Sequence, residues 1–157
     1  MILEEYKKRR KFNITSEPKA VVPQKNKSRF VIQEHNASHL HYDFRLEMPA
    51  ELSGEKIVLK SWAIPKNIPL EPKTKRLAVQ TEDHPVDYID FKGEIPKGEY
   101  GAGTVKIWDK GKFKLLEREQ DHIRFILKGV KARGEYILIK TRGFGGAQNS
   151  WLIFKAR

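Results

Sequence analysis

Residues 39–47 alternate strictly between polar and apolar side chains, and no other pattern in the chain restricts its fold as much. The polar positions are His39, His41, Asp43, Arg45 and Glu47, and the apolar positions are Leu40, Tyr42, Phe44 and Leu46. Successive side chains of a β-strand point to opposite faces, so a two-residue period is typical of a strand with one buried face. The segment therefore predicts a strand that presents five polar side chains together.

Other short apolar runs, bounded by glycine or proline, predict an all-β fold. A turn at 36–38 joins the alternating strand to an extended segment at 29–35. We expect further strands at 57–64, 76–81, 86–94, 103–109, 112–117, 122–128, 134–141 and 150–155. Many short strands of this kind are typical of a β-sandwich or β-barrel. The chain length of 157 residues suits one compact domain, and residues 142–149 predict a flexible loop.

The positive charge is concentrated near the N-terminus. The formal net charge is +11, and residues 1–30 hold nine Lys/Arg against three Asp/Glu. We expect residues 1–28 to form a basic arm with a short helix at 3–11, followed by the domain at 29–157. A disordered, solvated tail is the alternative. A surplus of this size favours nucleic acid as the partner, ahead of an anionic membrane.

The chain lacks cysteine, which excludes disulfides, thiolate metal sites and cysteine nucleophiles. It has no apolar run near the roughly 18 residues that a membrane span needs. The first residues also lack the basic and apolar regions of a signal peptide. We therefore expect a cytoplasmic protein with no membrane partner.

A group of histidines and one aspartate predicts a metal site. His41 and Asp43 share a face of the predicted strand, and the turn at 36–38 brings His35 back beside them. Nitrogen and oxygen ligands without sulfur favour Mn²⁺, Fe²⁺, Zn²⁺ or Mg²⁺. Only three protein ligands leave positions for water and substrate, which indicates a catalytic site. The alternative is that these histidines are ordinary surface or core residues.

Arg45 lies on the same strand face as the predicted ligands, where a guanidinium suits the bidentate binding of phosphate. A salt bridge to Glu47 or Asp43 is the alternative. Farther along the chain, Asp83-His84-Pro85 predicts a turn that could present His84 to phosphate, with Tyr88 following. The alternative is that His84 is a turn residue without a role. The glycine-rich segment 98–103 precedes a predicted strand instead of a helix, so we interpret it as a β-turn.

These residues belong to a longer pattern that resembles the 3′-phosphoesterase domain of bacterial ATP-dependent DNA ligase D, including its free-standing relatives. The matching stretches cover nearly the whole chain: HNASHLHYDFRLE (35–47), LKSWAIPK (59–66), KRLAVQTEDHPVDYIDFKGEIPKGEYGAG (75–103), VKIWDKG (105–111) and WLIFK (151–155). The resemblance implies a β-barrel and a Mn²⁺-dependent enzyme that heals 3′ ends. Such an enzyme removes a 3′-terminal ribonucleoside and then the remaining 3′-phosphate, within the repair of broken strands by non-homologous end joining.

The resemblance also implies roles for individual residues. The metal ligands would be His35, His41 and Asp43, with Mn²⁺ as the cofactor and Zn²⁺ or Co²⁺ as other metals. Phosphate contacts would come from Arg45 and His84. Supporting positions match Gln33, Lys66, Arg76 and Tyr88, and the ribonucleoside-removing step matches Arg10 and Glu17. A primer–template or a broken strand would be the substrate, and a separate DNA ligase or polymerase a partner.

Two departures from the family pattern and two rival functions stay open. Lys11 replaces an aspartate that is usual in ligase D, which bears on the diesterase step. Residues 49–58 are longer than the usual turn and predict a surface loop. One rival is a non-haem iron oxygenase that uses His41 and Asp43 with His84 or His122. The other is a non-catalytic barrel that binds nucleic acid.

Overall fold

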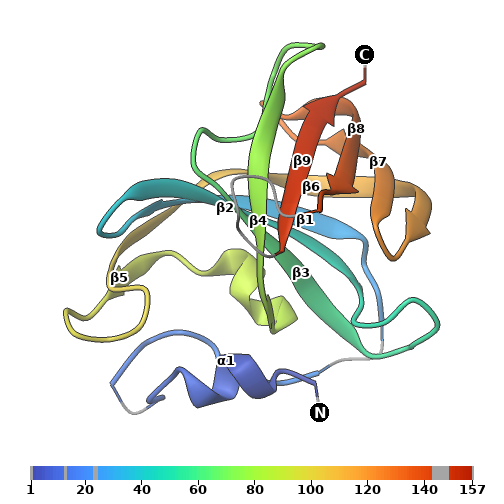
Figure 1. Cartoon of the computed structure of the whole chain (residues 1–157). Coiled ribbons are helices and arrows are strands. Elements are labelled where there is room, and N and C mark those ends of the chain that lie inside the picture. The colour runs from blue at the N-terminus through green and yellow to red at the C-terminus, as the bar shows by residue number, and fades with distance from the viewer. Residues whose placement is uncertain (1, 13, 23–24, 143–148, 157) are drawn as a thin grey trace.

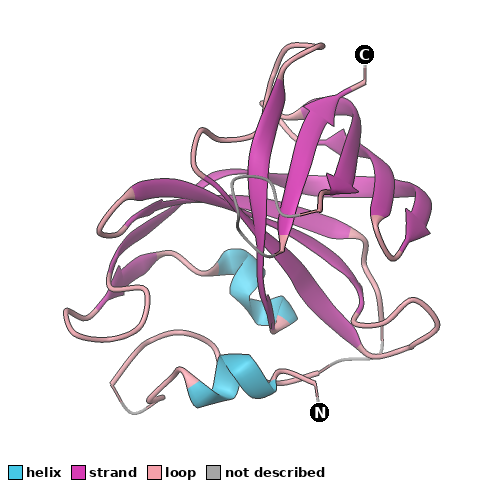
Figure 2. Ribbon diagram, viewed as in Figure 1, coloured by secondary structure: helices cyan, strands magenta, loops and turns pink. Residues whose placement is uncertain are grey.

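A computed structural model describes residues 2–12, 14–22, 25–142 and 149–156 of the chain. β-Strands dominate these residues, with a short α-helix and a 3₁₀ helix beside them (Figures 1 and 2). In chain order the elements are α1 (Glu4–Lys8), β1 (Arg29–Asn36), β2 (Leu40–Pro49), β3 (Ile57–Ile64), β4 (Lys75–His84), η1 (Val86–Asp90), β5 (Gly93–Ile95), β6 (Gly103–Glu119), β7 (His122–Lys128), β8 (Arg133–Lys140) and β9 (Ser150–Lys155).

Eight of the strands in the described residues close into an antiparallel barrel. Their order around the ring is β1-β2-β3-β4-β9-β8-β7-β6, and β6 pairs again with β1. β5 lies outside the ring, where it pairs with the first residues of β6. The mainly all-β barrel with a short N-terminal helix is therefore confirmed.

Two apolar clusters hold the fold together, one inside the barrel and one outside it. The apolar face of the alternating strand points inward, where Phe44 packs against Trp62 and Phe125. The second cluster joins the barrel to the segments beneath it in Figure 1, and includes Leu59 of β3, Tyr6 of α1 and Ile89 of η1. Because α1 and η1 bury side chains in this cluster, both stay close to the outer face of β1 and β3.

The prediction of a strand at 86–94 is wrong. Residues Val86–Asp90 form η1, and only Gly93–Ile95 are extended. In a strand, residues 86, 88 and 90 would share a face, but Asp90 is exposed while Val86, Tyr88 and Ile89 are buried. The tighter 3₁₀ spacing lets the three apolar side chains reach the outer cluster together.

Three other elements differ in length from their predictions. The strands predicted at 103–109 and 112–117 are one strand, β6, because Gly111 continues the strand and lets the chain approach its neighbour. A Cβ at Gly111 would lie 2.5 Å from the Lys128 carbonyl oxygen. β4 extends to His84, so this histidine ends a strand where we predicted a turn. The helix predicted at 3–11 is limited to Glu4–Lys8.

The described part of the N-terminal arm packs on the barrel. Tyr6 is fully buried, and its hydroxyl donates a hydrogen bond to the Pro18 carbonyl. The expected surface loop is present at residues 50–56. Most of the loop predicted at 142–149 lies outside the described residues. In the described residues, no helix is both long and apolar enough to cross a lipid bilayer.

Candidate metal and phosphate site

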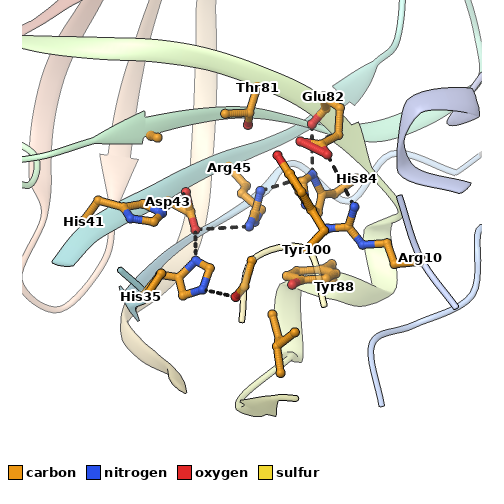
Figure 3. Close-up of a pocket in the computed structure, with 14 residues that line it drawn as sticks. Arg10, His35, His41, Asp43, Arg45, Thr81, Glu82, His84, Tyr88 and Tyr100 are labelled. Carbon is orange, nitrogen blue, oxygen red and sulfur yellow. Dashed lines mark hydrogen bonds and ion pairs between the residues drawn. The ribbon is translucent and has the colours of Figure 1, made fainter. Parts of the chain in front are cut away.

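A pocket of about 200 Å³ lies on the outer face of the barrel. β1 and β2 supply one group of polar side chains, and β4, η1, the arm and the β5–β6 connection supply the others (Figure 3). The lining includes Arg10, His35, His41, Asp43, Arg45, Thr81, Glu82, His84, Tyr88, Tyr100 and Gly101. Seven of the predicted site residues therefore line one pocket. Gln33 and Glu17 do not line it but hydrogen-bond to Arg45 and Tyr88, which do. Lys66 and Arg76 do not line the pocket.

The three predicted metal ligands converge in this pocket. In the β1–β2 hairpin, His35 lies opposite His41 and Gln33 lies opposite Asp43. His35 Nδ1 is 3.2 Å from Asp43 Oδ2, and His41 Nε2 is 3.2 Å from Asp43 Oδ1. One ligand atom from each residue lies within 4.8 Å of the others. This spacing permits one cation to contact all three side chains.

Backbone carbonyls fix which nitrogen of each imidazole faces the carboxylate. His35 Nε2 donates to the Gly101 carbonyl at 2.7 Å, and His41 Nδ1 donates to the His39 carbonyl at 3.1 Å. The other nitrogen of each ring faces an oxygen of Asp43: when it is protonated it donates to the carboxylate, and without a proton it directs a lone pair at it. Lone pairs facing each other repel unless a proton or a cation lies between them. The donor set therefore fits a divalent metal, with carbonyls orienting the ligands.

The Asp43 carboxyl is held in its ionised form. Burial alone would raise its pKa, because a charge is poorly solvated away from water. Hydrogen bonding with His35 and His41 and the charge of Arg45 outweigh burial and hold the pKa of Asp43 well below its ordinary value. Hydrogen bonding with Asp43 also raises the pKa of His41. The pocket thus keeps an anionic ligand available at neutral pH.

Arg45 is buried beside the ligand cluster and fixed on several sides. Its Nε donates to Gln33 Oε1 at 2.7 Å, and its guanidinium lies 4.8 Å from the centre of the Tyr88 ring. Gln33 is itself oriented, because its amide nitrogen donates to the carbonyls of Tyr88 and Phe91. Arg45 is also 3.6 Å from Asp43. A guanidinium with so little freedom is prepared to bind an oxyanion.

His84 sits in the pocket in its neutral form. Burial and the charges of Arg45 and Arg10 lower the pKa of His84 well below its ordinary value. Its Nδ1 donates to the Glu82 carbonyl at 2.9 Å, while Nε2 accepts from Arg10 at 3.3 Å. Its role as a phosphate contact stays a prediction. A proton transfer from this ring would need these contacts to change.

The arm delivers Arg10 and Glu17 to the same pocket. Arg10 Nε is 3.2 Å from Glu17 Oε2, and Glu17 also accepts from the Tyr88 hydroxyl at 2.7 Å and from Thr15. The Arg10 guanidinium stacks 4.2 Å from the centre of the Tyr6 ring. The arm is therefore joined to η1 and to His84 by a buried polar network.

Sequence reasoning missed Glu82, Tyr100 and the Gly101 carbonyl. Glu82 accepts from Arg9 and Arg10, and the Tyr100 hydroxyl accepts from Arg9 at 2.7 Å. Tyr100 remains partly exposed at the pocket mouth. All three lie within the matched EDHP and GEYGAG stretches, so the signal was present. The segment 98–103 is a turn, as we interpreted it, but it contributes to the site.

The structure does not bring Lys66 and Arg76 into the pocket lining. Lys66 is exposed in the turn after β3, and Arg76 Nη1 donates to the carbonyls of Lys66, Asn67 and Ile68. Their predicted catalytic part stays a prediction. The rival metal triad with His122 is not assembled, because His122 pairs with Glu117 on the β6–β7 hairpin, away from this pocket.

Comparison with known proteins gives a consistent result. Residues 33–140 match the family model of the DNA Ligase D 3′-phosphoesterase domain. The chain is 45% identical over 163 aligned positions to the multifunctional non-homologous end joining protein LigD of Pseudomonas aeruginosa, covering 99% of this chain and 18% of that protein. It is 44% identical over 151 positions to LigD of Mycolicibacterium smegmatis, covering 89% of this chain and 18% of the relative.

LigD of Mycobacterium tuberculosis is 43% identical over 132 positions, which cover 82% of this chain and 16% of that protein. The chain thus spans under a fifth of the length of these relatives. The family model covers the β1–β2 hairpin, η1 and the segment 98–103, which form most of the pocket. On this match and these identities, the chain belongs to the DNA ligase D 3′-phosphoesterase domain family.

Proposed function

We propose that this protein is a metal-dependent phosphoesterase that heals the 3′ ends of broken DNA or RNA strands. It would remove a 3′-terminal ribonucleoside as a phosphodiesterase and a 3′-phosphate as a phosphatase, leaving a 3′-hydroxyl. The observation that carries the proposal is the convergence of His35, His41 and Asp43 beside the fixed guanidinium of Arg45. A cation site next to an oxyanion site is what phosphate hydrolysis requires.

His35, His41 and Asp43 would hold the metal, with Mn²⁺ as the proposed ion and Zn²⁺ or Co²⁺ as alternatives. When bound, such an ion supplies Lewis-acid stabilisation of charge on phosphate oxygens. The donor set of two imidazoles and one carboxylate suits these ions, but does not select among them.

The remaining side chains bind and orient the phosphate. Arg45, held by Gln33 and Tyr88, would bind two of its oxygens and stabilise the charge that grows on them in the transition state. Arg10 would supply a second guanidinium from the arm. His84 would donate a hydrogen bond to phosphate through Nε2 once Arg10 turns toward the substrate and this nitrogen takes up a proton.

The diesterase step would depend on the arm more than the phosphatase step does. Arg10 and Glu17 reach the pocket from the arm, while His41, Asp43 and Arg45 are on the barrel. Lys11, which is exposed, stands where ligase D usually has aspartate, so this step is the one we expect to differ from the relatives. We also propose that residues 1–28 act as an arm on a barrel domain at 29–157, and that a separate ligase or polymerase completes repair.

The test uses a labelled primer–template ending in 3′-phosphate, incubated with Mn²⁺. We expect the wild type to produce a 3′-hydroxyl and His41→Ala to be slower by at least about a hundredfold, because a metal ligand is lost. His39→Ala is the matched control, since His39 is exposed and gives His41 only its carbonyl. No conversion by the wild type, or equal conversion by His41→Ala, would exclude the function. A 3′-terminal ribonucleotide tests the diesterase step.

A further inference from the structure

Three cationic side chains form a row across neighbouring strands of the barrel, outside the pocket. Lys112 of β6 lies directly opposite Lys128 of β7, and Lys128 lies directly opposite Arg133 of β8. All three are exposed. Directly paired residues of a sheet share a face, so their side chains project together. We call these three residues the basic ladder.

The basic ladder lacks the neutralisation that other cations of the barrel receive. Arg29 pairs with Glu47 at 2.8 Å, and Arg124 with Glu135 at 3.7 Å. In the described residues, no carboxylate oxygen lies within 4.0 Å of a side-chain nitrogen of the three ladder residues, so none of them forms an ion pair. Like charges directly opposite each other destabilise a sheet. A polyanion bound over the row would remove this repulsion.

The ladder lies on the same outer face of the sheet as the pocket. Along β1, alternate residues from Arg29 to His35 share that face, and their partners in β6 run from Lys112 to Val105, with a bulge between. His35 is a pocket residue and lies opposite Val105. Lys112 is seven residue steps along β6 from Val105, which is about 23 Å of strand. Figure 1 shows β6 running from β5 at one end toward β7 at the other.

The surface between the pocket and the ladder carries little negative charge that would repel a polyanion. η1 covers this stretch and exposes Asp87 and Asp90. Asp90 is paired with Lys110 at 3.4 Å, so its charge is balanced. Lys114, two residues beyond Lys112 on the same face, extends the positive surface on the far side.

We propose that the basic ladder binds the phosphate backbone of duplex nucleic acid behind the 3′ end that occupies the pocket. The inference rests on the proposed function and specifies its substrate: a recessed 3′ end on a duplex long enough to reach the ladder. At about 3.4 Å per base pair, 23 Å corresponds to about seven base pairs. Shorter duplexes would fill the pocket without touching the ladder.

The test compares two variants of equal net charge. One changes the ladder by Lys112→Gln, Lys128→Gln and Arg133→Gln. The control changes three exposed lysines elsewhere: Lys56→Gln, Lys73→Gln and Lys140→Gln. Binding to a 20-base-pair duplex with a recessed 3′-phosphate is measured from low to high salt. The ladder variant should bind about tenfold or more weakly, and the slope of log K against log salt should be shallower by roughly 2 to 3.

Duplex length separates this inference from the proposed function. The ladder variant should hydrolyse a five-base-pair substrate ending in 3′-phosphate at the wild-type rate. On the long substrate its KM should be higher and its kcat unchanged. Equal salt slopes for the ladder and control variants would overturn the inference. An equal loss on short and long duplexes, or on a single strand, would overturn the duplex assignment. If the wild type binds through the ladder but hydrolyses nothing, the proposed function fails while the surface remains.

Discussion

The two halves of the pocket are built in different ways. The metal half comes from one hairpin, in which His35, His41 and Asp43 lie within nine residues of chain and one strand register brings them together. The arm half comes from Arg10, whose partners Glu82 and His84 lie more than 70 residues away in the chain. The first half depends on local pairing and the second on packing of the arm against β4 and η1.

This difference separates the chemistry from the selection of the substrate. A hairpin that forms part of the wall of a closed barrel is rigid, which suits ligands that must stay in place around one ion. An arm held by a few buried contacts can detach at lower cost than the barrel can open. We therefore expect changes in the hairpin to remove all activity, and changes in the arm to affect the diesterase step first.

The largest effect should follow Asp43→Asn, which breaks the metal half. The change removes the charge that both imidazoles and Arg45 contact. Mn²⁺ affinity should fall at least about tenfold and the rate of 3′-phosphate removal at least about a hundredfold. Calorimetry measures the first and the labelled primer–template the second. Asp121→Asn, in an exposed turn, is the control, and unchanged Mn²⁺ affinity in Asp43→Asn would contradict the metal site.

A smaller and selective effect should follow Glu17→Gln, which disturbs the arm half. The substitution weakens charge-assisted contacts to Arg10 and removes the anionic acceptor of the Tyr88 hydroxyl. Removal of a 3′-ribonucleoside should fall about tenfold, as expected for the loss of one such bond. Phosphatase activity and Mn²⁺ affinity should change far less.

Glu5→Gln is the control for the arm, because Glu5 pairs with Arg9 on the exposed side of α1 at 3.5 Å. Both activities are measured in each variant on the same labelled strands. An equal loss of the two activities in Glu17→Gln would show that the pocket works as one unit, against the division into two halves.

The smallest effect concerns the junction of the halves, at His84. Its pKa is lowered in the folded protein, so below pH 6.5 the unfolded chain binds a proton that the folded chain does not. Stability from this group is therefore complete above pH 6.5 and falls as the pH drops, by up to about 1.4 kcal/mol per pH unit. Urea unfolding of wild type and His84→Gln at pH 7.5 and 5.5 measures the difference. The wild type should lose about 1 kcal/mol more than the variant; an equal loss would contradict a neutral His84.

Predictions from the sequence succeeded where one element carries its own pattern. The alternation at 39–47 gave the strand, its inward apolar face and the position of Asp43 beside His41. It did not give the burial of the polar face, where Asp43, Arg45 and Glu47 are also buried. The prediction failed at 86–94, where the apolar residues do not follow a two-residue period and pack against the outer face of the barrel. His84 was expected in a turn, because its place at the end of β4 depends on pairing with β3.

The sequence by itself determined the grouping of His35, His41 and Asp43 and the resemblance to the family, because a short hairpin fixes its own register and the family motifs are continuous stretches of the chain. Only the tertiary structure decided what surrounds the cluster. Tyr100 and Glu82 meet Arg9 and Arg10 of the arm through the packing of the arm on the barrel. Contacts of this kind join residues far apart in the chain, and no local periodicity records which of them will be neighbours.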